Sequence, residues 1–158
     1  IAFNRDEAKI TIMQVPDTPG IAFNILGPIA KANIDVDMII QNQSTNGTTD
    51  FSFTVHRNEF KKAMEVLETE VKPVIGAALV IGDDKVCKVS AVGIGMRSHV
   101  GVASLMFETL AKSRVNIQMI STSEIKISVV IEDKYMELAV RELHKVFDLE
   151  QGDHVESV

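Results

Sequence analysis

The chain has 158 residues, of which 46% are hydrophobic, and this length fits one ordinary domain or two small ones that pack on each other or on a partner chain. A formal net charge of −6 argues against nucleic acid or an anionic membrane as a partner, since both attract a positive surface. A single cysteine excludes an internal disulfide and, with no membrane-spanning run or signal peptide in evidence, predicts a cytoplasmic protein.

The first half of the chain predicts the order strand, helix, strand, strand, helix, strand. Ile10, Ile12 and Val15 alternate with polar residues, as in a half-buried strand, and a proline- and glycine-rich turn at 16–20 ends that strand. Apolar residues then recur at helical spacing from 21 to 32. The further expected elements are strands at 36–43 and 50–56 around an Asn46-Gly47 hairpin turn, a helix capped by Asn58 that buries Phe60, Ala63, Met64 and Leu67, and a closing strand at 77–81.

The second half repeats this pattern after an expected junction at 82–85. Its predicted elements are strands at 86–93, 116–121 and 126–132 and helices at 100–113 and 134–147. No closing strand is evident, because the tail after Asp148 is short and polar. The apolar triplet Ile1-Ala2-Phe3 belongs to no other element, so we expect it to supply that strand. The predicted domains are therefore 8–82 and 86–150, the second completed by 1–4.

The two halves also align residue by residue, which is the strongest evidence for a duplication. Gly20-Ile21-Ala22 matches Gly101-Val102-Ala103, 81 positions later, and Met38-Ile39 matches Met119-Ile120 at the same offset. After a shorter loop the offset becomes 76, and Phe51 to Val55 then match Ile127 to Ile131. We therefore predict an α+β fold of two tandem ferredoxin-like βαββαβ units, with antiparallel sheets and helices on one face.

Motifs for catalysis or nucleotide binding are weak. The run 93–97 begins like a dinucleotide-binding turn, but Ser98 replaces its third glycine. The four histidines lack metal-ligand spacing, and Cys87 lies in a predicted strand as a small buried side chain. Asp35 and Asp37 form either an acid–base pair or the solvated start of a strand. One tyrosine and no tryptophan argue against an RNA-recognition module. We predict no catalytic residue and no metal site.

The loops before the first helix of each copy are the best candidates for binding. Gly20 stands at a helix N-terminus, where unpaired N–H groups and the helix dipole favour an anion such as the carboxylate of an amino acid. The equivalent loop is 97–102. Polar residues at strand ends, such as Gln41, Asn42 and the run 121–124, would satisfy an ammonium group. The alternative is that these residues only make caps and turns.

Four stretches carry a resemblance to a known family: QVPDTPG at 14–20, DMIIQN at 37–42, GTTD at 47–50 and VNIQMISTSEIKIS at 115–128. They resemble the C-terminal regulatory region of aspartate kinases, which is a pair of ACT domains, and the resemblance covers nearly the whole chain. It implies an allosteric module that gives feedback inhibition by threonine, lysine or both in aspartate-family amino-acid synthesis. The chain alone would not be an enzyme, because the ATP- and magnesium-using kinase domain that phosphorylates aspartate is absent from it, and it would hold no cofactor of its own.

The resemblance also implies partners and pockets. Such modules form homodimers in which the first ACT unit faces the second unit of the partner, and some occur as a separate beta subunit beside a catalytic alpha subunit. Effectors would bind between the paired units. By position, the threonine-type pocket would use Asp17, Gly20, Ile21, Ala22 and Gln41 with Asn116 and Ile117 of the partner subunit. The lysine-type pocket would use Asp37, Ser123, Val100, Gly101, Val102 and Ala103.

One position departs from the family pattern. Val100 stands where a proline usually precedes the glycine, which leaves the second loop less preorganised. Two other interpretations are open at this point: an ACT pair from another amino-acid enzyme, and a small catalytic domain in its own right.

Overall fold

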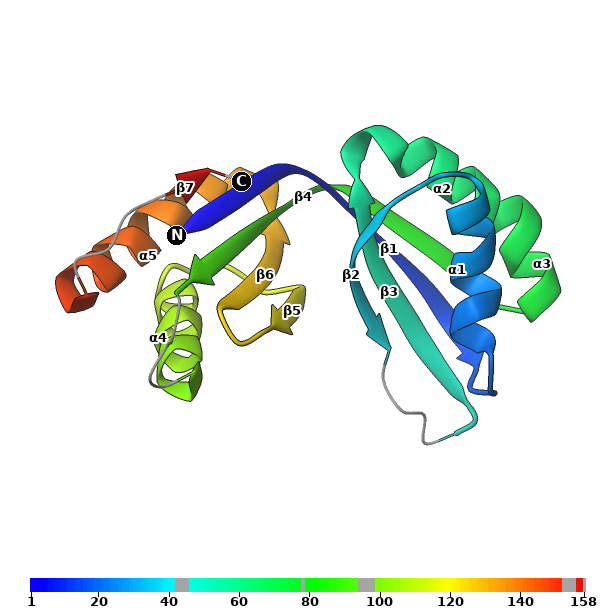
Figure 1. The fold of residues 1–158 in the computed structure, drawn as a ribbon, viewed down its shortest axis with the longest axis horizontal. Helices are drawn as coiled ribbons and strands as arrows, with labels where there is room; N and C mark the ends of the chain where they lie inside the picture. Colours follow the sequence, from blue (N-terminus) through cyan, green and yellow to red (C-terminus); the bar gives the residue numbers. More distant parts are fainter. Residues whose placement is uncertain (42–45, 78, 94–98, 152–155, 158) are drawn as a thin grey trace. The chain divides into compact units, whose positions relative to one another are not determined.

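The computed structural model describes residues 1–41, 46–77, 79–93, 99–151 and 156–157. The chain forms two compact units, a first unit of Asp6–Asp84 and a second unit that joins Ile1–Arg5 to Lys85–Val158. Two long strands, β1 (Ala2–Pro16) and β4 (Leu79–Val92), each run from one unit into the other (Figure 1). The expected junction at 82–85 contains the boundary between the two units, which falls after Asp84 and inside β4. These polar residues are extended in spite of their low strand propensity, because they belong to a strand that pairs with β1.

In the first unit the strand order is β2 (Val36–Gln41), β3 (Thr48–His56), β1 and β4, so β2 is the edge strand. β1 pairs antiparallel with β3 from Glu7 opposite His56 to Pro16 opposite Thr48. The helices cover one face of this sheet (Figure 1). They are α1 (Ile21–Lys31) and a second helical stretch made of η1 (Arg57–Glu59), α2 (Phe60–Val66), the π-helical η2 (Leu67–Val71) and α3 (Lys72–Ile75).

The core of the first unit lies between these helices and the sheet. Ile10 and Ile12 of β1 and Ile25 of α1 are fully buried in it. The predicted cap at Asn58 is wrong. Nδ1 of His56 accepts a hydrogen bond from the backbone N–H of Asn58 at 3.1 Å, so the imidazole two residues earlier caps the helical stretch.

In the second unit the strand order is β1, β4, β6 (Lys126–Glu132) and β5 (Met119–Thr122), with β5 at the edge. The beginning of β1 occupies the place of a closing strand, and Ile1 is buried in this unit's core. The short β7 (Glu156–Ser157) pairs in parallel with Ala2 and Phe3.

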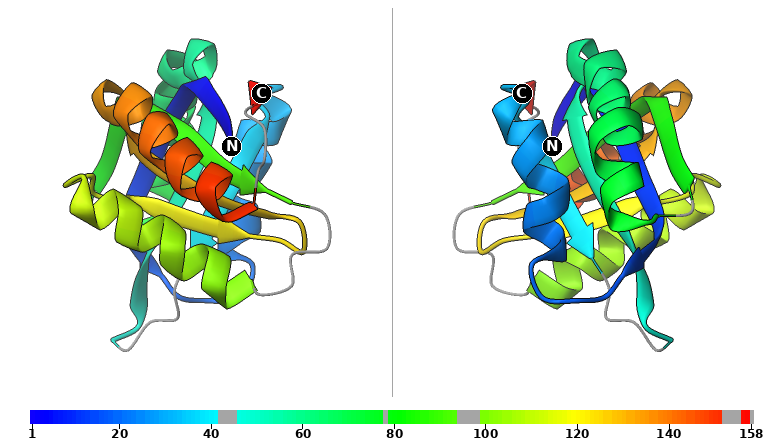
Figure 2. Two further views of the ribbon diagram at one scale, coloured as in Figure 1. Left: turned by 90° about the vertical axis from the view of Figure 1, so that its left-hand side faces the viewer. Right: turned by 90° about the vertical axis from the view of Figure 1, so that its right-hand side faces the viewer.

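The helices α4 (His99–Lys112) and α5 (Met136–Gln151), the latter preceded by η3 (Asp133–Tyr135), lie side by side over the strands of the second unit (Figure 2). Cys87 of β4 is fully buried against them, as predicted. No helix within the described ranges combines the length and the apolar content that crossing a lipid bilayer requires.

Candidate functional site

The loop before α1 opens the start of that helix to solvent. Gly20 is the N-cap residue, in a left-handed conformation (φ 85°) and with no side chain to cap the helix. The N–H of Ile21 donates to the carbonyl of Thr18 at 3.2 Å, whereas the helix itself offers no carbonyl to the N–H groups of Ala22 and Phe23. Residues 17–20 are exposed. An anion can therefore approach these amides at the positive end of the helix dipole.

A hairpin holds this loop in place. The N–H of Asp17 donates to the carbonyl of Gly47 at 3.0 Å, and the N–H of Gln14 donates to Oδ1 of Asp50 at 3.2 Å. Gln14 is itself left-handed, with φ of 55°. Gln14, Gly47 and Asp50 were not among the predicted site residues. Asn46-Gly47 marks the turn in the sequence, but nothing there shows that its carbonyl reaches the loop.

The two predicted site residues of β2 lie at opposite ends of that strand. β1 and β2 are both antiparallel to β3, so they run in the same direction. Gln41 is paired with Phe51 and ends β2 at the same end of the sheet as the Asp17 loop. Asp37 lies four residues earlier, roughly 13 Å away along the strand. Within the first unit the structure therefore groups Gln41 with Asp17, Gly20, Ile21 and Ala22, and separates Asp37 from them.

In the second unit the predicted residues are also separated along the edge strand: Asn116 and Ile117 precede β5, and Ser123 follows it. Val100 and Gly101 are exposed in the first turn of α4, and Ser123 follows the end of β5. The N–H of Ser123 donates to the carbonyl of Lys126 at 2.7 Å and closes the hairpin between β5 and β6. Arg97 and Ser98 of the second loop, the run 94–97 of the dinucleotide-like motif and Asn42 lie outside the described residues.

A groove of about 560 Å³ lies at the other end of β5. Two of the predicted site residues, Asn116 and Ile117, line it. Arg114, which no sequence motif singles out, adds a guanidinium group that suits a carboxylate. The remaining lining residues are Phe107, Ala111 and Val115.

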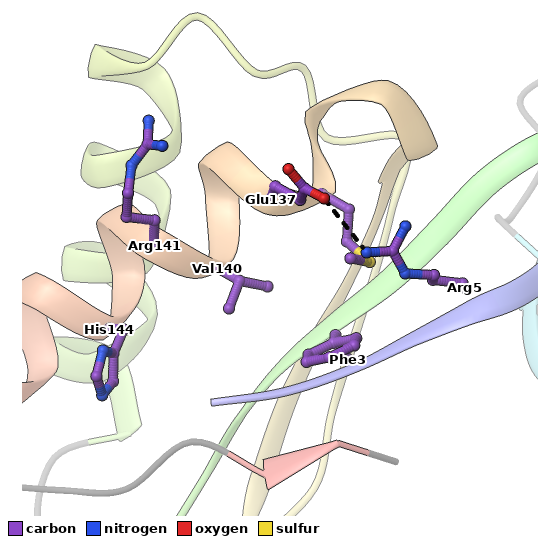
Figure 3. Close-up of a pocket in the computed structure, with 7 residues that line it drawn as sticks. Phe3, Arg5, Glu137, Val140, Arg141 and His144 are labelled. Atoms are coloured by element: carbon purple, nitrogen blue, oxygen red, sulfur yellow. Dashed lines mark ion pairs between the residues drawn. The ribbon is translucent and has the colours of Figure 1, made fainter.

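A second hollow of about 240 Å³ lies between the beginning of β1 and α5 (Figure 3). Phe3, Met136 and Val140 form its apolar part, with Arg141 and His144 also lining it. Nη2 of Arg5 is 3.6 Å from Oε1 of Glu137, and both side chains are exposed, so the ion pair contributes about 1 kcal/mol at most. None of these residues belongs to the predicted site.

Titratable groups outside these loops show little that points to chemistry. Burial lowers the pKa of Lys9 in β1, and the Asp83 carboxylate partly opposes that shift. Among the described residues, no three His, Cys, Asp or Glu side chains are grouped in a way that would hold a metal ion. The exposed loops and the groove are therefore the best candidates for a binding site in the described part of the chain.

The ACT-domain family matches this chain twice, over residues 9–71 and 89–147. Over 150 residues the chain is 69% identical to the aspartate kinase of Pseudomonas putida, and this match covers 95% of this chain but only 36% of that protein.

Two solved structures match nearly end to end. One chain in a crystal structure of aspartokinase alpha and beta subunits is 62% identical, with a TM-score of 0.86 over 92% of this chain and 95% of that one. The ligand-free regulatory subunit of aspartate kinase from Thermus thermophilus is 39% identical, with a TM-score of 0.85 and the same coverage. The chain therefore spans 36% of the curated relative and almost all of a regulatory subunit. With its two ACT domains, it belongs to the aspartate kinase family as the regulatory region.

Proposed function

We propose that this chain senses threonine, lysine or both and thereby gives feedback inhibition of an aspartate kinase. The observation that carries the proposal is the start of α1, where Gly20 leaves the helix N-terminus without a side-chain cap and exposed to solvent. An amino-acid carboxylate supplies the anion that such an end favours.

The threonine-type pocket would combine this helix start with polar groups from two strands. The N–H group of Ala22 in the first turn would face the carboxylate, beside Ile21, whose own N–H donates to the carbonyl of Thr18. The amide of Gln41 would contact the ligand's side chain or ammonium group. Asn116 and Ile117 of the partner subunit would close the pocket. Their groove carries the Arg114 guanidinium, which gives that side of the pocket a further donor for a carboxylate.

The lysine-type pocket would use the opposite ends of the same strands. The carboxylate of Asp37 would bind the side-chain ammonium of lysine in a charge-assisted hydrogen bond. Ser123 and the turn from Val100 to Ala103 would hold the remainder of the ligand.

This division of residues supports a homodimer in which the first unit of one chain pairs with the second unit of the other. The threonine-type pocket combines the end of β2, at Gln41, with the residues just before β5. The lysine-type pocket combines the start of β2, at Asp37, with the residue just after β5. Two antiparallel edges side by side bring those ends together. Ile39 on β2 and Ile120 on β5 are 52% and 42% exposed, and such a pairing would bury both.

Inhibition would follow from ligand-stabilised pairing. An amino acid that bridges two chains binds the assembled form and not the separated one, so it shifts that equilibrium. A coupling of about 1–3 kcal/mol per site is typical. A catalytic subunit or kinase domain, which would use ATP and magnesium to phosphorylate aspartate, would receive this change. This chain would contribute no cofactor to the reaction.

Calorimetry with threonine, lysine, both together and methionine tests the binding. We expect heat from threonine or lysine and none from methionine. Sedimentation with and without threonine tests the mechanism, since the association constant should rise with the ligand. An association constant that the ligand leaves unchanged would rule out ligand-stabilised pairing.

A further inference from the structure

We infer that Gln14 and Asp50 are positioning residues that aim the helix start at Gly20 toward its ligand. This inference rests on the proposed function, because it concerns the same loop. Neither residue touches the proposed ligand or packs in the core, and both control the geometry of the amides that would bind the ligand.

The first observation is a bulge in β1. Ile12 pairs with Phe51 and Val15 pairs with Thr49, so β1 spends one more residue than β3 between these two pairs. Gln14 lies in that bulge with φ of 55°, a left-handed conformation that a glutamine rarely adopts. Its N–H donates to the Asp50 carboxylate at 3.2 Å. In this left-handed conformation the N–H of Gln14 thus has the Asp50 carboxylate as its hydrogen-bond acceptor.

The second observation is the path of the chain after the bulge. Pairing with β3 resumes at Val15 and Pro16, and the next amide, that of Asp17, donates to the carbonyl of Gly47 at 3.0 Å. The bulge therefore sets where the loop leaves the sheet. Because only the short run from Asp17 to Gly20 separates this point from α1, it also sets the direction in which the helix starts.

Local hydrogen bonds hold the described residues that lead into β3. Oδ1 of Asn46 accepts hydrogen bonds from the N–H of Thr48 at 3.2 Å and from its hydroxyl at 3.1 Å. Gly47 has φ of 84°, which glycine adopts without strain. The same strand reaches Gln41 through its pairing with Phe51. Gly47 and the first residues of β3 thus contact both the loop and the strand end of the proposed threonine pocket.

The exposure of Gln14 and Asp50 distinguishes a positioning role from a contribution to core packing. Gln14 and Asp50 are both exposed, so truncating either removes no core packing. Loss of the carboxylate would instead let Gln14 relax toward the extended conformation and turn the loop. A single hydrogen bond of ordinary net strength corresponds to about a three- to tenfold change in affinity.

The main experiment compares Asp50→Ala, Asp50→Asn and the control Glu65→Ala by threonine calorimetry on the whole chain. Asp50→Ala should bind threonine about three- to tenfold more weakly. Asp50→Asn should bind like the parent, because its amide oxygen accepts the same bond. Glu65→Ala removes one exposed carboxylate from α2 of the same unit and should change nothing. The proposed lysine pocket uses Asp37, Ser123 and the turn of the second unit, so lysine should bind Asp50→Ala like the parent.

A second pair of variants tests the bulge without touching Asp50. Gln14→Gly adopts positive φ freely and should retain threonine affinity, whereas the β-branched Gln14→Val resists it and should weaken binding as Asp50→Ala does. Equal affinities for these two variants, or for Asp50→Ala and Asp50→Asn, would overturn the inference.

Hydrogen exchange of the Asp17 amide in the ligand-free chain keeps the two proposals apart. We expect faster exchange in Asp50→Ala than in Asp50→Asn whether or not threonine binds. If the parent chain binds neither threonine nor lysine, the proposed function fails while this readout still tests the positioning. If the parent binds threonine and the Asp17 exchange is the same in all variants, the positioning fails while the proposed function stands.

Discussion

The hydroxyl oxygens of Ser90 and Ser128 lie 2.7 Å apart across β4 and β6, in a buried pair of directly opposed residues. Thr11 and Ser52 make the same contact at 2.9 Å across β1 and β3, also directly opposed. The duplication therefore extends to a polar cross-strand pair, and not only to the apolar residues of the alignment. The two copies differ in burial, because the pair in the first unit is only partly buried.

This difference predicts unequal effects of hydroxyl removal. Ser128→Ala should lower the free energy of unfolding by about 1–3 kcal/mol, because it leaves the buried Ser90 hydroxyl without this partner. The double variant Ser90→Ala/Ser128→Ala should lose less than the sum of the single variants. Ser52→Ala, where water can replace the hydroxyl of Thr11, should lose less than Ser128→Ala. Urea unfolding measures all of these losses, and strictly additive losses at 90 and 128 would contradict the expectation.

Gly82 permits close packing against α2. A Cβ at this position would lie 2.5 Å from Cζ of Phe60 and 2.9 Å from Sδ of Met64. Gly82→Ala should therefore destabilise the chain by about 1–3 kcal/mol through overpacking. Phe60→Leu, added to Gly82→Ala, should recover part of that loss because it shortens the side chain in the way. An unchanged urea midpoint for Gly82→Ala would show that α2 yields without strain.

The separation of Asp37 from Gln41 predicts selective effects on the two effectors. Asp37→Ala should weaken lysine more than threonine, because it removes the proposed partner of the side-chain ammonium; a charge-assisted bond corresponds to about 1.5–3 kcal/mol. Gln41→Ala should weaken threonine and leave lysine nearly unchanged. Calorimetry with each amino acid measures the four affinities. Equal effects of one variant on both ligands would refute the pocket assignment.

The lowered pKa of Lys9 predicts a change of stability at alkaline pH. Burial disfavours the charged amine in the folded state, so the unfolded chain binds more protons between the lowered pKa and the ordinary value of 10.5. The contribution of Lys9 to the free energy of unfolding should therefore rise with pH across that interval. Lys9→Met should remove this rise, measured as the difference from the parent in urea unfolding. Lys112→Met, at an exposed lysine paired with Glu108, serves as the control. If the free energies of unfolding of the parent and of Lys9→Met change in parallel with pH, the effect is excluded.

Hydrophobic periodicity and the internal repeat predicted most of the fold. α1 spans Ile21–Lys31 where a helix was expected at 21–32, and β6 spans the predicted 126–132. β5 starts at Met119 instead of 116, because Asn116 and Ile117 line the groove beside α4 before the chain joins β6. Local pattern gives the type of an element more securely than its ends.

Contacts between distant residues are the part of the structure that the sequence did not reveal. Residues 82–85 are one glycine and three charged residues, a composition typical of a loop. They nevertheless form part of β4, which pairs with β1. The left-handed conformation of Gln14 depends on a bulge, and a glutamine carries no propensity that announces one. Arg114 likewise gains a place in the candidate site only because the chain turns after α4.

The passage of β1 and β4 through both units has a consequence for modularity. Two covalent crossings tie the units together, so no single cut of the chain separates them into complete halves. A fragment that starts at residue 6 lacks the strand that lies beside β4 in the second unit, and a fragment that ends at 84 carries that strand without its sheet. Recombination that moves one ACT unit into another protein would have to break a strand. The pair would therefore have to be transplanted or engineered as one piece, although its sequence is a duplication of one unit.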